Sequence, residues 1–133
     1  MMLAYEAFAP NPGFNPVRKG IARFAELDDE ARNMLIAENP DYGELVCRCQ
    51  KVTRAEILQA LHNPLGVHTM VGVKYRTRSM MGRCQGGYCQ MRIAEMIEEE
   101  LRVKAEDIRY ARQGSWLFSG AVRGEEAAWK QGM

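Results

Sequence analysis

The four cysteines of this 133-residue chain constrain its fold and chemistry most, because they occur as two close pairs. Cys47 and Cys49 form a C-x-C sequence in "VCRCQ", and Cys84 and Cys89 form a C-x4-C sequence in "GRCQGGYC". The first residues, "MMLAYEAFAPNPGFNP", show no secretion signal, so we expect a cytoplasmic protein. Thiols stay reduced there, and paired cysteines hold metal more often than they form disulfides. The four cysteines are therefore candidate metal ligands.

Four thiolates complete either a tetrahedral zinc site or an all-cysteine iron–sulfur cluster. Structural zinc sites usually use C-x2–4-C pairs. In an extended C-x-C segment both side chains point to the same side, which suits the wider edge of a two-iron cluster. We therefore expect a [2Fe–2S] cluster on Cys47, Cys49, Cys84 and Cys89. The alternatives are a structural zinc site in an interaction module without redox role, and disulfides or metal-free thiols.

The residues between and after the second cysteine pair support an anionic metal group. Gly86 and Gly87 lack a Cβ atom, so the backbone can approach a cluster and direct N–H groups at its sulfurs. Cys89 precedes a strongly amphipathic segment, and the N-terminus of a helix there would stabilise a thiolate.

Basic residues are concentrated around the cysteines. The net charge is only +1, yet residues 57–94 contain no acidic residue, while Arg48 lies inside the C-x-C sequence. We interpret this basic region first as a surface that balances an anionic cluster, and second as a docking face for an acidic partner. Nucleic-acid binding is not expected, because the net charge is small and a cluster already accounts for the basic residues. The basic residues of residues 74–92 are Lys74, Arg76, Arg78, Arg83 and Arg92.

The periodicity predicts a small, mainly α domain. Helices are expected in "ELDDEARNMLIAENP", capped by Asp28, and in "VTRAEILQALHNPLG", where Thr53 and Glu56 form a capping box. "HTMVGVKYRTRS" is predicted to be a helix capped by Thr69, with a strand as the alternative. "QMRIAEMIEEELRV" has the clearest helical period, and "KAEDIRYARQGSWLF" is expected to pack back on the core.

The chain divides into three predicted parts. Residues 1–44 form an extended arm or linker with one short helix, residues 45–112 form the cluster-binding helical domain, and residues 113–133 form a C-terminal tail that Trp129 could anchor. No apolar run approaches the roughly 18 residues of a membrane span.

The remaining candidate residues have structural interpretations. His62 and His68 are not expected to be ligands, since four cysteines complete the set. Met80 and Met81 are expected to shield the metal from water, and Tyr75 and Tyr88 are interpreted as packing residues. No constellation of acid, base and nucleophile indicates a catalytic site, so whether the chain belongs to an enzyme stays open on this evidence.

The stretches "CRCQKVTRAEILQAL" and "GVKYRTRSMMGRCQGGYC" resemble the bacterioferritin-associated-ferredoxin-like [2Fe–2S] domain. They are most similar to the version at the C-terminus of FAD-dependent glycerol-3-phosphate dehydrogenase-like oxidoreductases. The resemblance covers roughly residues 20–118, and it includes "RFAELDDEARNMLIAENPDYGELVCRC" and "GSWLF". It implies a helix-turn-helix-like iron–sulfur domain with an extended N-terminal arm. It also implies four cysteine ligands to iron, and electron transfer to or from a flavin or a redox partner protein.

One departure from such flavoproteins is important. They bind FAD through a G-x-G-x-x-G unit, and no stretch of this chain resembles one. The resemblance therefore implies that FAD is held by an associated flavoprotein. We expect the chain to be the C-terminal domain of that oxidoreductase, or else a small subunit beside it.

Overall fold

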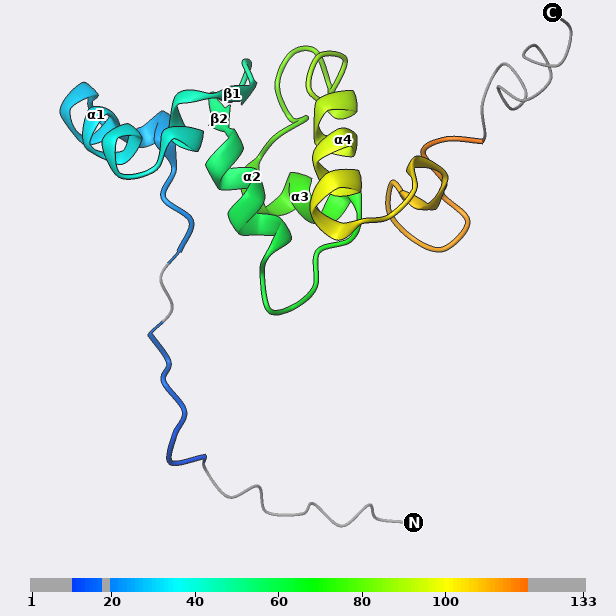
Figure 1. Ribbon diagram of the computed structural model, residues 1–133, viewed down its shortest axis with the longest axis horizontal. Coiled ribbons are helices and arrows are strands. Elements are labelled where there is room, and N and C mark those ends of the chain that lie inside the picture. Colours follow the sequence, from blue (N-terminus) through cyan, green and yellow to red (C-terminus); the bar gives the residue numbers. More distant parts are fainter. Residues whose placement is uncertain (1–10, 18–19, 120–133) are drawn as a thin grey trace, which may run out of the picture.

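The computed structural model describes residues 11–17 and 20–119 and confirms a mainly α fold (Figure 1). The described residues contain the helices α1 (Asp29–Glu38), α2 (Arg54–Leu61), α3 (Met70–Thr77) and α4 (Gln90–Leu101). Strands β1 (Leu45–Cys47) and β2 (Val52–Thr53) form a small antiparallel hairpin, and three 3-10 turns are η1 (Phe24–Glu26), η2 (Pro40–Gly43) and η3 (Ala105–Asp107). Across this described part, no helix combines the length and apolarity needed to cross a membrane.

The first three helices begin at the residues that the sequence predicts. The Asp28 carboxylate accepts the Ala31 N–H at 2.9 Å, and the Thr69 hydroxyl accepts the Gly72 N–H at 3.1 Å. Thr53 and Glu56 form both hydrogen bonds of the predicted capping box. Residues 70–77 are therefore helical, and the strand alternative for this segment is wrong.

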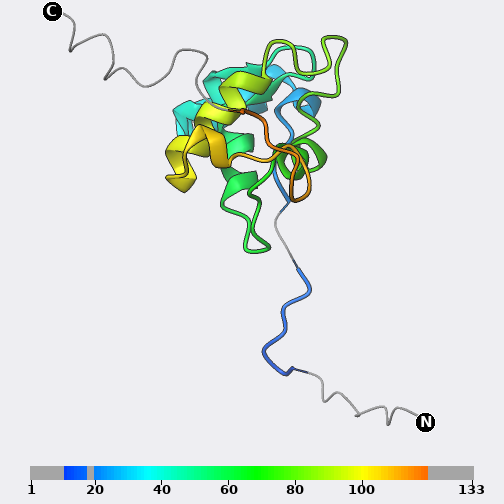
Figure 2. The same cartoon turned by 90° about the vertical axis from the view of Figure 1, so that its right-hand side faces the viewer.

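Helices α2, α3 and α4 pack around one core, and both views show them side by side (Figures 1 and 2). Ile57 of α2, Val73 of α3 and Ile93 of α4 are fully buried at its centre. The loop from His62 to Thr69 joins α2 to α3 and is longer than the turn of about 3–4 residues in DNA-binding helix-turn-helix motifs. The three helices thus form the scaffold from which the cysteine-bearing loops extend.

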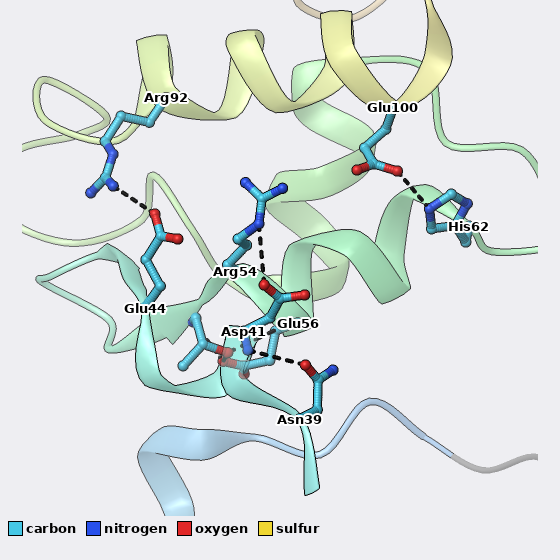
Figure 3. Close-up of polar contacts among 9 residues, drawn as sticks. Asn39, Asp41, Glu44, Arg54, Glu56, His62, Arg92 and Glu100 are labelled. Atoms are coloured by element: carbon cyan, nitrogen blue, oxygen red, sulfur yellow. Dashed lines mark hydrogen bonds and ion pairs between the residues drawn. The ribbon is translucent and has the colours of Figure 1, made fainter. Parts of the chain in front are cut away.

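The segment before residue 45 contacts the helical domain through η2. Tyr42 is buried and its hydroxyl accepts the Gln59 side-chain N–H of α2 at 2.7 Å. Asp41 forms an ion pair with Arg54 at 3.3 Å (Figure 3). Residues 11–17, by contrast, form neither helix nor strand. The boundary at residue 45 stays a prediction, but packing contacts cross it.

The segment after α4 also packs on the scaffold, as predicted. The carbonyl groups of Arg109 and Tyr110 accept the N–H groups of Met70 and Val71, which are otherwise unpaired at the start of α3. Ile108 is buried, and the nearby apolar side chains Leu117 and Phe118 pack against the core. Contacts therefore also cross the predicted boundary at residue 112. The end of the predicted tail, with Trp129, lies outside the described residues.

Glu56 provides a stability test, because burial raises the pKa of its carboxyl group despite hydrogen bonds from Thr53 and Phe24 and the nearby charge of Arg23. The folded state therefore binds the proton more tightly than the unfolded state. This contribution is complete below the unfolded pKa of about 4.3 and is lost as the pH rises through the folded pKa. We expect the unfolding free energy of the wild type, relative to Glu56→Gln, to fall as the pH rises above about 4.

Urea denaturation followed by far-UV circular dichroism at several pH values checks this expectation. Glu98→Gln, on the exposed face of α4, is the control and is expected to follow the wild type. A Glu56→Gln variant with the same pH dependence as the wild type would contradict the expectation.

Candidate metal centre

The four cysteines lie at one end of the helical domain but in two different environments. Cys47 is the last residue of β1 and is 1% exposed, whereas Cys49 is exposed in the β1–β2 turn. Cys84 is exposed in the loop between α3 and α4, whereas Cys89 is fully buried at the N-cap of α4. The prediction of an extended C-x-C segment is wrong after Cys47, because the strand ends there and the chain turns.

The sulfurs pair between the two segments and not within them. The Sγ atoms of Cys49 and Cys84 are 3.6 Å apart. The buried Cys47 and Cys89 form the second pair, since the neighbouring Cys47 thiol helps to raise the pKa of Cys89. Figures 1 and 2 both show the β1–β2 turn and the loop before α4 at the same end of the helices. All four cysteines are free thiols.

The thiols of Cys84 and Cys89 have pKa values shifted in opposite directions, for physical reasons. The Tyr88 backbone N–H, the Cys49 thiol and the Gly86 backbone N–H donate to Sγ of Cys84 and lower the pKa of its thiol. Burial, together with the neighbouring Cys47, raises the pKa of Cys89 to about 11. The Cys84 thiol thus loses its proton more readily than an ordinary cysteine, whereas a bound cation would favour the loss of the proton from Cys89.

The backbone of the cysteine-bearing loops adopts uncommon conformations that bring N–H groups to the sulfurs. Lys51, Met80 and Gln85 have φ angles of 52°, 61° and 47°, in the left-handed region that non-glycine residues seldom adopt. Gly86 has a φ of 94°, and its backbone N–H is one of the groups that lower the pKa of the Cys84 thiol. Such conformations each cost on the order of 1 kcal/mol and cluster at functional sites.

Apolar side chains enclose the buried half of the centre. Met80 is 2% exposed and belongs to the same buried cluster as Cys47 and Cys89. Its backbone N–H also donates to Sγ of Cys89. The predicted shielding role fits Met80 best, since Met81 is only half-buried.

Gly82 is a site residue that the sequence interpretation missed. A Cβ atom at this position would overlap the Cβ of Cys49 and lie 3.3 Å from its Sγ. The absence of a side chain therefore lets the two cysteine-bearing segments meet. The available signal was a glycine two residues before Cys84, but spacing alone does not show that it contacts the other pair.

The histidines are not part of this centre. His62 Nε2 is 3.0 Å from the Glu100 carboxylate, which joins the ends of α2 and α4 (Figure 3). His68 is exposed in the loop before α3. Across residues 11–17 and 20–119, no three His, Cys, Asp or Glu side chains gather closely enough to hold a single metal ion.

The basic residues near the cysteines form two kinds of contact, ion pairs and a cation–π contact. Arg54 pairs with Asp41, and Arg92 pairs with Glu44 at 2.8 Å. Arg48 instead lies over the ring of Tyr88, with 4.4 Å from its Cζ to the ring centroid. Tyr75 and Tyr88 are 71% and 40% exposed, so neither side chain packs in the core.

The donor set fits a two-iron group better than a single ion. Two sulfurs on one tetrahedral metal at about 2.3 Å are about 3.8 Å apart, close to the Cys49–Cys84 separation of 3.6 Å. A zinc ion would need all four sulfurs at such separations, whereas a [2Fe–2S] cluster needs two separate pairs. The described cysteines form two pairs without a close group of three.

Comparisons with known proteins agree with this arrangement. The model of the BFD-like [2Fe-2S] binding domain matches residues 45–99. The chain is 38% identical to a glycerol 3-phosphate dehydrogenase of Caloramator mitchellensis over 112 residues, which are 84% of this chain and 23% of that protein. It is 39% identical to hydrogen cyanide synthase subunit HcnB of Pseudomonas aeruginosa over 80 residues, 57% of this chain and 16% of HcnB.

A further relative is anaerobic glycerol-3-phosphate dehydrogenase subunit A1 of Haloferax volcanii, 34% identical over 119 residues, 80% of this chain and 19% of that subunit. The chain thus spans less than a quarter of the length of each of these three relatives. No solved structure matches the chain.

The contact between Gly82 and Cys49 predicts the effect of one methyl group. Gly82→Ala is expected to displace Cys49 from Cys84, lower the metal content and cost about 1–3 kcal/mol of unfolding free energy, as overpacking does. Metal analysis and denaturant unfolding measure both effects. Gly20→Ala is the control, because a Cβ atom there meets nothing within 4 Å. Equal metal content in the two variants would show that this close approach is not required.

Proposed function

We propose that the four cysteines of this chain are the ligands of a [2Fe–2S] cluster, because the model of the BFD-like [2Fe-2S] binding domain matches residues 45–99. The observation that carries this assignment is the pairing of sulfurs between the two segments. Each iron would take one cysteine from the C-x-C sequence and one from the C-x4-C sequence. The exposed Cys49 and Cys84 would hold one iron, and the buried Cys47 and Cys89 the other.

We further propose that the domain relays single electrons. When bound, the cluster supplies one-electron oxidation and reduction. The chain presents Cys49 and Cys84 at its surface, where a redox partner can approach them. On the inner side, Met80 and the core exclude water, while N–H groups donate to the sulfurs. Burial and N–H groups are the means by which a protein sets the potential of a cluster.

The proposed partner is an FAD-dependent, glycerol-3-phosphate dehydrogenase-like oxidoreductase, of which this chain is a C-terminal domain or a small subunit. Two observations support this proposal. The relatives named above are a glycerol 3-phosphate dehydrogenase, a subunit of one and a hydrogen cyanide synthase subunit. This chain also corresponds to less than a quarter of the length of each of them.

The ligand assignment predicts the effect of single substitutions. We expect the wild type, after anaerobic reconstitution, to contain about two irons and two sulfides per chain and to absorb visible light. Cys84→Ser is expected to abolish stable cluster incorporation, whereas His68→Ala leaves the spectrum unchanged. Iron, zinc and sulfide analysis with visible absorption measures the outcome. A colourless protein with about one zinc per chain would establish the structural zinc alternative. A His68→Ala spectrum changed as much as that of Cys84→Ser would contradict the all-cysteine ligand set.

The partner is tested separately in the source genome. We expect this stretch to be continuous with, or adjacent to, a reading frame that encodes a G-x-G-x-x-G unit for FAD. A protein that assembles the cluster but has no such frame beside it would overturn the partner and leave the ligand assignment intact.

A further inference from the structure

The ring of Tyr88 lies close to two guanidinium groups. The Cζ atom of Arg48 is 4.4 Å from the ring centroid, and that of Arg92 is 5.9 Å from it. Both distances lie within the roughly 6 Å range of cation–π attraction. Tyr88 is 40% exposed, so this contact is made at the surface of the domain and not in its core.

The two arginines come from different parts of the chain. Arg48 lies in the β1–β2 turn between the first two cysteines, and Arg92 lies in the first turn of α4. Arg92 also binds the start of the hairpin, through the Glu44 carboxylate at 2.8 Å and the Leu45 carbonyl at 3.2 Å. Figure 3 shows Arg92 reaching from α4 to Glu44. Arg48, Tyr88 and Arg92 thus form a clamp between the two cysteine-bearing segments that uses no cysteine.

The backbone of Tyr88 contacts the metal centre directly. Its N–H donates to Sγ of Cys84, while its side chain projects into the clamp. Residue 88 therefore connects a hydrogen bond on a ligand sulfur with a contact to the opposite segment. Hydrogen bonds to ligand sulfurs raise the reduction potential of an iron–sulfur cluster, since they stabilise the added negative charge.

We propose that Tyr88 is a positioning residue for the cluster: the clamp joins the two cysteine-bearing segments and holds the Tyr88 N–H against Sγ of Cys84. This inference rests on the proposed function of the domain. It assigns to Arg48 a structural role in addition to its charge. Replacing the ring therefore affects the cluster although no charge and no ligand is removed.

The test compares Tyr88→Leu with two matched variants. Tyr88→Phe keeps the ring, and Tyr75→Leu removes a tyrosine that is 71% exposed on α3. An exposed cation–π pair is worth about 0.5–1 kcal/mol, so Tyr88→Leu is expected to lose its cluster to a chelator about two- to fivefold faster. Its reduction potential is expected to shift to a more negative value. Tyr88→Phe and Tyr75→Leu are expected to match the wild type in both measurements.

A double-mutant cycle with Arg48→Leu isolates the stacking from the charge of Arg48. The two substitutions are expected to be non-additive in the rate of cluster loss, because either one alone opens the clamp. Arg48→Leu also serves as the test if Tyr88→Leu does not fold. Additive effects, or a Tyr88→Leu variant that matches Tyr75→Leu, would overturn the clamp while leaving the cluster assignment in place. A wild type that assembles no cluster would instead overturn the proposed function, and this inference with it.

Discussion

The close approach of Gly82 to Cys49 is the contact that brings the two cysteine-bearing segments together. Two segments more than thirty residues apart must meet there for Sγ of Cys49 and Cys84 to lie 3.6 Å apart, and even one methyl group at residue 82 would separate them. Helices α2, α3 and α4 make the meeting possible because they fix the ends of both segments: β2 leads directly into α2, and the second cysteine loop connects α3 to α4. The scaffold is conventional in its caps and core. The cysteine-bearing loops that it holds are unusual, since they contain several residues with left-handed backbone conformations.

The helical scaffold explains how the protein tolerates the backbone strain of the cysteine-bearing loops. Left-handed residues such as Met80 and Gln85 each cost on the order of 1 kcal/mol, and isolated loops would relax from such conformations. Here the strain is offset by hydrogen bonds within the loops, such as Gly87 N–H to the Cys84 carbonyl at 2.9 Å, and by burial of Met80. Metal–thiolate bonds would add to this, because binding energy at such a site is also folding energy. The loops and a metal group bound between them would therefore stabilise each other.

The helices, their caps and the ligand candidates could be predicted from the sequence because each depends on residues close together in the chain. Asp28, Thr53 and Thr69 cap helices through contacts three residues away, and the apolar period of α4 is visible in its own sequence. The pairing of sulfurs, the role of Gly82 and the exposure of Tyr88 depend on contacts between distant segments, which spacing does not reveal. The prediction of an extended C-x-C segment was wrong for a related reason. The hairpin requires a turn between β1 and β2, and Arg48 and Cys49 lie in that turn.

The charged side chains of the domain are paired in space in a way that the composition does not indicate. Arg54 and Arg92 are neutralised by Asp41 and Glu44, which the sequence places in a separate acidic segment before the cysteines. The acidic and basic segments therefore compensate each other across the interface between the hairpin, α2 and α4, and fewer basic groups are left to act on the metal. Among these, Arg48 lies over the ring of Tyr88 and is next in sequence to Cys49 of the exposed pair. Charge, ring and backbone N–H thus act on the same exposed half of the centre, where a partner would exchange electrons.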